Sequence, residues 1–181
     1  MLNAHSMHNI EAAFHKAIRA HWVQDPADTC EITPLICEVI RDQDEHKMLL
    51  ITISSFVFRL IVIFGVTEDS ATRAYYLHLD AAQPLDEVLG EVANMCGGAL
   101  NRTLAANFSH LAMSTPCTLS GQCMPFLDKL RAQSVSRYAI TINGSVRIQA
   151  ALCMCCLEPI EVADEPETEQ GEPCAGELEL F

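Results

Sequence analysis

Apolar side chains recur at helical spacing in two stretches of the sequence. The first covers residues 7–23, where Ile10, Phe14 and Ile18 lie four positions apart and Pro26 follows the run. Positions with this spacing share one face of an α-helix, and a proline cannot continue the helix. We therefore expect an amphipathic opening helix over residues 7–23.

The clearest helical pattern runs from Pro84 to Asn107. Pro84 takes the first helical position, which tolerates proline because its N–H would have no partner in the helix, and Asp86 and Glu87 follow in the positively polarised first turn. The apolar positions form one stripe that we expect to face the core: Leu85, Val88, Leu89, Val92, Cys96, Ala99, Leu100 and Leu104. The pattern predicts a long helix with one buried face and one solvent face.

Several stretches are typical of β-strands. Residues 30–41 come close to alternation of apolar and polar positions, and Pro34 indicates an edge position or a bulge because proline donates no ladder hydrogen bond. Residues 48–54 and 57–65 are two apolar runs separated by Ser54-Ser55, which predicts a hairpin.

Four further elements complete the pattern. We expect a short helix over residues 68–79 and a strand over residues 111–119. Asn143-Gly144 is a strong signal for a tight hairpin turn, so we expect it to join strands at Tyr138–Ile142 and Val146–Cys155.

The apolar stretch from Met48 to Val66 is also long enough to span a bilayer as a helix. However, Ser54 and Ser55 interrupt it, Arg59 lies beyond them, and the Ile, Val, Phe and Thr content suits strands. We favour two buried strands over a transmembrane helix.

The charge of the chain is concentrated in one segment. The formal net charge is −13, and residues 158–181 carry nine acidic side chains and no Lys or Arg. Such a composition buries too little apolar surface to fold, so we expect one domain over residues 1–157 and a disordered acidic segment after it. Because no Lys/Arg cluster is present, nucleic acid is an unfavourable partner.

Nine cysteines are an odd number, and the first twenty residues lack the apolar run of a signal peptide. We therefore expect reduced thiols and a cytoplasmic protein. Cys153, Cys155 and Cys156, together with Cys30, Cys37 or Cys123, do not have zinc-site spacing. Residues 155 and 156 face opposite sides of a strand, so buried apolar thiols are the better interpretation.

The long helix also carries polar groups that could perform chemistry. Glu91, Asn94, Gly98 and Asn101 recur every three or four positions and share the face opposite the apolar stripe. A carboxylate and an amide at this spacing are common on surface helices and indicate little alone. Asn101 is interpreted as a solvated residue.

The surrounding sequence makes this pair more specific. Gly90-Glu91-Val92-Ala93-Asn94-Met95, then Gly97-Gly98, then Ser114-Thr115-Pro116 and Gly121, together resemble the motif of the CheC/CheX/FliY phosphatase family, and a single copy is most similar to CheX. The turn at Ser54-Ser55-Phe56 departs from the family, which has glycine there.

The resemblance implies a fold and a function. The expected fold is an α/β (α+β) two-layer domain, CheX-like, with a mainly antiparallel sheet packed by the opening helix and the long central helix. The implied function is hydrolysis of the aspartyl phosphate of a phosphorylated CheY-like response regulator, with one site per chain. Glu91 matches the acid that contacts a lysine of the partner, and Asn94 matches the amide that orients the attacking water.

The resemblance also bears on cofactors and partners. The chain is expected to hold no cofactor of its own, with Mg²⁺ bound by the partner regulator, and to form a homodimer. The alternative is a non-catalytic binding or scaffold module of the same fold in chemotaxis, flagellar or two-component signalling. Gly97 and Gly98 leave two explanations open, close packing of the helix against the sheet or close approach of a partner.

Overall fold

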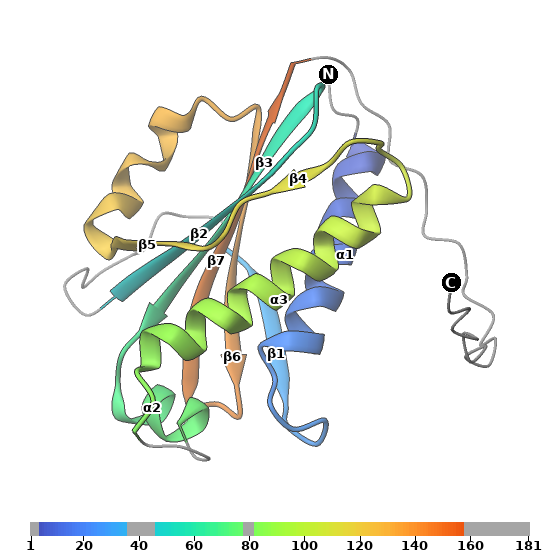
Figure 1. Ribbon diagram of the computed structural model, residues 1–181. Coiled ribbons are helices and arrows are strands. Elements are labelled where there is room, and N and C mark those ends of the chain that lie inside the picture. The colour runs from blue at the N-terminus through green and yellow to red at the C-terminus, as the bar shows by residue number, and fades with distance from the viewer. Residues whose placement is uncertain (1–3, 36–45, 78–81, 158–181) are drawn as a thin grey trace, which may run out of the picture.

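The computed structural model describes residues 4–35, 46–77 and 82–157. Seven strands form one antiparallel sheet in the order β1-β6-β7-β3-β2-β4, with β5 also paired to β2 (Figure 1). The elements are α1 (Ala4–His21), β1 (Cys30–Pro34), β2 (His46–Ser54), β3 (Phe58–Thr67), α2 (Ser70–Tyr76), α3 (Leu85–Ala105), β4 (Ala112–Met113), β5 (Cys117–Ser120), the 3₁₀ helix η1 (Gly121–Leu130), β6 (Ser134–Ile142) and β7 (Val146–Cys156).

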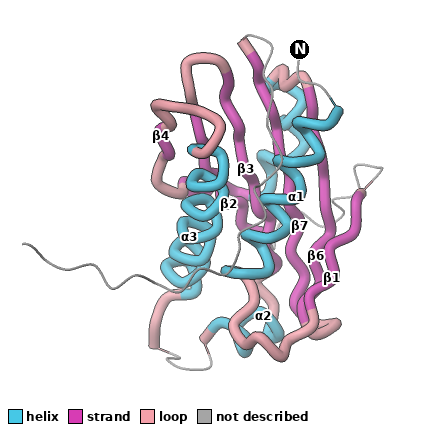
Figure 2. The backbone as a smooth tube through the Cα atoms, turned by 90° about the vertical axis from the view of Figure 1, so that its right-hand side faces the viewer, coloured by secondary structure: helices cyan, strands magenta, loops and turns pink. Residues whose placement is uncertain are grey.

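Helices cover the two faces of the sheet unequally. Helices α1 and α3 lie side by side on one face, and α2 lies at one end of the sheet (Figure 2). The core between them is centred on large aromatic side chains, including Phe14 and Trp22, which pack on Phe64 of β3. On the other face η1 covers a smaller apolar cluster that includes Met48, Ile63 and Cys153. The predicted two-layer α/β fold with a mainly antiparallel sheet is confirmed.

The apolar stretch around Ser54-Ser55 is a β-hairpin. Strands β2 and β3 pair from His46–Thr67 to Ser54–Arg59, and the Ser55 hydroxyl accepts hydrogen bonds from the backbone N–H groups of Val57 and Phe58. The run lacks polar alternation because β3 is central and both its faces are covered. Among the described helices, none is both long and apolar enough to cross a membrane.

Two sequence signals correctly predicted features of strands β1, β6 and β7. Asn143 and Gly144 both have positive φ, 50° and 67°, as a tight two-residue hairpin turn requires, and they join β6 to β7. Pro34 ends β1, which is an edge strand. Proline is therefore found where a missing backbone donor is tolerated.

The structure also differs from the predicted elements. Pro84 is the extended N-cap of α3 rather than its first helical residue, with ψ of 128°. The strand expected over residues 111–119 is two short strands, β4 and β5, which pair with different parts of β2. The helix η1 was not predicted. Residues 36–41, residues 78–79 and the expected disorder of residues 158–181 lie outside the described residues.

Candidate functional site

Helix α3 presents one buried face to the sheet and α1. The predicted stripe is buried at Leu85, Leu89, Val92, Cys96, Leu100 and Leu104. Val88 and Ala99 are only partly buried, while Ala93 and Gly97 are buried and widen the stripe on its other side. The buried face is thus rotated toward β2 and β4 relative to the prediction.

The predicted pair lies on the opposite side of this helix. Glu91 is exposed and Asn94 is half-exposed. Neither side chain has a hydrogen bond or ion pair with another described residue. Because the fold does not use the carboxylate or the amide, both groups remain available to a molecule that docks on α3.

Two neighbouring glycines in α3 have different surroundings. A Cβ atom on Gly97 would lie 3.0 Å from Ile51 Cδ1 and 3.3 Å from Met113 Sδ, so the helix approaches β2 and β4 too closely for a larger residue to fit without adjustment. A Cβ atom on Gly98 would have only Arg102 Nη1 nearby, at 3.6 Å. Packing explains Gly97, whereas Gly98 and Gly90 leave a flat, open backbone beside Glu91 and Asn94.

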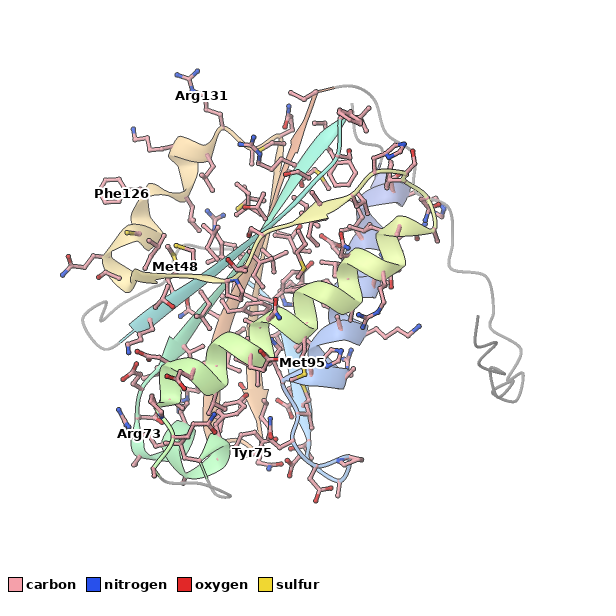
Figure 3. All side chains as sticks on the ribbon, viewed as in Figure 1. Met48, Arg73, Tyr75, Met95, Phe126 and Arg131 are labelled. Atoms are coloured by element: carbon pink, nitrogen blue, oxygen red, sulfur yellow. The ribbon has the colours of Figure 1, made fainter. Side chains whose placement is uncertain are left out.

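Two other residues of α3 bear on the site: Met95, which the sequence motif includes, and Asn101, which was expected to be solvated. Met95, one turn after Glu91, is 40% exposed and adds an apolar group to the same surface (Figure 3). Asn101 is not a solvated residue: it is half-buried, and its Oδ1 atom is shielded from solvent without a hydrogen-bond partner. Helical spacing alone did not predict this burial.

A charged network holds the start of α3 against the sheet. Lys47 of β2 forms ion pairs with Asp86 in the first turn of α3 and with Glu68 after β3, the latter at 2.7 Å. Arg73 of α2 also reaches Glu68, at 3.4 Å. The hydrogen bonds that Lys47 donates to Asp86 and Glu68 raise the pKa of Lys47. These contacts fix the direction in which α3, with Glu91 and Asn94, leaves the sheet.

The Ser114-Thr115-Pro116 step lies between β4 and β5, next to the same helix. Ser114 is tied to β2 twice, because its backbone N–H donates to Thr52 O at 2.9 Å and its Oγ accepts from Thr52 N at 3.0 Å. Met113, just before it, contacts the Gly97 position of α3. The glycine part of the motif and the strand that precedes Ser114-Thr115-Pro116 therefore meet in space, although Gly97 and Met113 are sixteen positions apart along the chain.

Other groups considered in the sequence do not form a site. The seven described cysteines are free thiols, and no cluster of His, Cys, Asp and Glu in the described part of the chain is arranged to hold a metal ion. Cys153 is buried, while Cys155 and Cys156 are half-buried; Cys37 lies outside the described residues. His15 is packed edge-on against Tyr138, and desolvation lowers its pKa.

Comparison with known proteins identifies the fold. No protein-family model matches the sequence, and neither does any curated protein. Among solved structures, a CheX–CheY–BeF₃–Mg²⁺ complex from Borrelia burgdorferi matches with a TM-score of 0.58 at 13% identity, covering 82% of this chain and 97% of that chain.

Two further solved structures extend this comparison. The chemotaxis protein CheX from Desulfovibrio desulfuricans gives a TM-score of 0.57 at 14% identity, covering 80% of this chain and 98% of that chain. The FliM middle domain from Vibrio alginolyticus gives a TM-score of 0.50 at 7% identity, covering 81% and 92%. The predicted CheX-like fold is therefore confirmed, and at these identities the similarity concerns the fold alone.

Proposed function

We propose that this protein is a phosphatase that binds a phosphorylated CheY-like response regulator and accelerates hydrolysis of its aspartyl phosphate. The observation that carries the proposal is the unpartnered Glu91/Asn94 pair on the solvent face of α3, within a fold shared with CheX proteins. One of those structures is itself a complex of CheX with CheY.

The reaction needs little covalent help from the protein. A water oxygen attacks the phosphorus, the bond from phosphorus to the aspartyl oxygen breaks, and its electron pair stays on the carboxylate, so that the products are a free aspartate and inorganic phosphate. Such phosphoryl transfers gain mainly from positioning and from electrostatic stabilisation. A side chain that holds the water in line is sufficient to accelerate the step.

Asn94 suits that positioning role. Its carboxamide offers two N–H donors and a carbonyl acceptor, so that it can hold a water by accepting from it without taking its proton. Glu91, one turn earlier, would contact a lysine of the regulator and fix the orientation of docking. Mg²⁺ would be bound by the regulator, and this chain is proposed to hold no cofactor of its own.

Met95 and the open glycines support a docking surface rather than a pocket. Gly90 lets a partner approach the backbone of α3 closely, because nothing lies within 4 Å of a Cβ atom placed there, and at Gly98 only Arg102 Nη1 lies nearby, at 3.6 Å. Met95 adds an exposed, flexible apolar group of a kind that adapts to partner surfaces. The site is completed only when the regulator brings its phosphoryl group to Asn94.

Substitution of the two site residues tests the proposal. Asn94→Ala should abolish the acceleration of phospho-regulator hydrolysis, measured as phosphate release, and Glu91→Ala should do so below saturating concentrations of this protein. Thermal unfolding should stay unchanged in both, because neither side chain supports the fold. Glu87→Ala is the matched control, since Glu87 is also an exposed acid on α3. Full activity in both site variants would rule the assignment out.

A non-catalytic binding or scaffold module is the second candidate, because the FliM middle domain has the same fold. The intact Glu91/Asn94 pair argues against it. Binding of a regulator, with and without beryllofluoride activation, separates the two: preference for the activated form favours the phosphatase, and equal binding favours the scaffold. A homodimer and a cytoplasmic location remain predictions that accompany either function.

A further inference from the structure

Three exposed cationic side chains gather at one end of the sheet, on the face opposite α1 and α3. Arg59 begins β3 and is paired in register with Cys155 of β7. The Cys155 thiol donates to the Leu130 carbonyl at 3.8 Å, and Lys129 and Arg131 flank Leu130 at the end of η1 (Figure 3 labels Arg131). We call Arg59, Lys129 and Arg131 the basic surface.

The basic surface is not neutralised within the described part of the chain. Arg59, Lys129 and Arg131 are all exposed, and none forms an ion pair with a described residue. In contrast, Lys47 and Arg73, at the other end of the sheet, are both paired with acids. Within the described ranges, these three cations are therefore without an acidic partner, in a chain that has an excess of carboxylates.

The chain leaves the sheet beside this surface. The side chain of Gln133 holds Cys156 by two hydrogen bonds, donating to its carbonyl at 2.7 Å and accepting from its N–H at 2.8 Å. The next residue, Leu157, donates its N–H to the Val57 carbonyl at 2.8 Å. Both anchors neighbour the basic surface, since Gln133 follows Arg131 and Val57 precedes Arg59 by two residues.

The sequence that follows has the complementary charge. Residues 158–181 carry nine acidic side chains and no Lys or Arg, and the first acids, Glu158 and Glu161, come directly after the anchored residues. We propose that residues 158–181 dock on the basic surface of their own chain. This inference is independent of the proposed phosphatase function, because α3 lies on the opposite face of the sheet.

Two physical effects favour binding of residues 158–181, rather than of a separate acidic molecule, to the basic surface. A segment attached next to its binding site has an effective concentration of about 1 mM. Attraction between exposed charges extends over a Debye length of about 8 Å at physiological ionic strength, and in the sequence Glu158 directly follows Leu157, which is anchored beside the basic surface. Phe126 of η1, which is 62% exposed, offers an apolar contact for the leucines and phenylalanine of residues 178–181 (Figure 3).

Zero-length carbodiimide crosslinking of the full chain tests the docking. The reagent joins a lysine amine to a carboxylate only where the two touch, and the chain has three lysines, Lys16, Lys47 and Lys129. Mass spectrometry should show Lys129 joined to acids of residues 158–181. The Lys47 pairs with Glu68 and Asp86 serve as an internal check of the fold.

Charge reversal provides the matched control. Arg59→Glu combined with Arg131→Glu should reduce the Lys129 crosslinks several-fold, and Arg131→Glu alone should reduce them in part. Arg147→Glu should leave them unchanged, because Arg147 is exposed near the start of β7, at the opposite end of the sheet. Raising the salt to about 1 M, where the Debye length falls to about 3 Å, should also weaken them.

Three outcomes would overturn the proposal. The first is the absence of Lys129 crosslinks to residues 158–181. The second is equal loss in the Arg59/Arg131 and Arg147 variants, which would make the contact non-specific. The third is crosslinks that join heavy-isotope and light chains in a mixture, which would make a second copy the occupant.

Discussion

Helical spacing predicted that Asn94 and Gly98 face solvent, but it did not predict the burial of Asn101. Their exposure follows from the helical period, because positions three and four apart along α3 share its solvent face, and the structure places Glu91, Asn94 and Gly98 there. The helical period did not predict the burial of Asn101, whose Oδ1 atom is shielded from solvent. Burial of a single side-chain atom depends on the packing around the helix, and local spacing contains no information about that packing.

The two adjacent glycines yield a prediction at the same scale. Gly98→Ala should raise the free energy of unfolding by about 1 kcal/mol, because alanine is the better helix former and the position is open. Gly97→Ala should gain less or lose stability, since its Cβ would press on Ile51 and Met113. Urea unfolding of the two variants measures the difference, and an equal gain in both would contradict the packing described for Gly97.

Helices and strands with a regular apolar pattern were predicted correctly, whereas the short elements without such a pattern were not. Helix α3, the β2–β3 hairpin and the β6–β7 hairpin follow from apolar period and turn residues. The sequence predicted β4 and β5 as a single strand. The break between them depends on their pairing to different parts of β2, which local sequence does not show. The helix η1 contains Gly121 and Pro125, which suggest a loop; its fixed position comes from packing over Met48 and Cys153.

The ion-pair network at the start of α3 gives a prediction for that element. Lys47→Gln should lower the free energy of unfolding by about 1 kcal/mol, since one cation serves two carboxylates and exposed pairs contribute little individually. Arg147→Gln is the control, because Arg147 is exposed and forms no ion pair with a described residue. Chemical denaturation at low and high salt measures the effect. A loss that is equal in the Lys47 and Arg147 variants, or independent of salt, would exclude a role for the network.

At the scale of the whole molecule, the sheet has two different edges. Strand β1 ends in Pro34, which limits strand addition, whereas all four residues of β5 are exposed. Exposed edges can pair with another chain. We therefore expect the predicted homodimer to form through the β5 side of the sheet.

Self-association through β5 is testable in solution. Leu119→Lys should raise the dissociation constant of the dimer by about tenfold or more, because it places like charges opposite each other in a two-fold pairing. Sedimentation velocity across a concentration series measures the change, with Thr33→Lys on the β1 edge as the control. Dimers that weaken only in the Thr33 variant would assign the interface to the other edge.

The two proposed sites, the phosphatase site and the basic surface, lie apart in the molecule. The proposed phosphatase surface lies on α3, while the basic surface near η1 lies on the opposite face of the sheet (Figure 1). Variants of Arg59 and Arg131 should therefore leave phosphate release unchanged at saturating regulator concentration. This separation allows each proposal to fail without the other.

The most direct test of the central claim is the rate of phospho-regulator hydrolysis as a function of the concentration of this protein. Asn94→Ala should lower the rate at saturation by about 100-fold, as expected when an attacking group loses its positioning, with the half-saturating concentration little changed. Glu91→Ala should mainly raise the half-saturating concentration. Wild-type curves for both variants would contradict the proposed phosphatase site on α3.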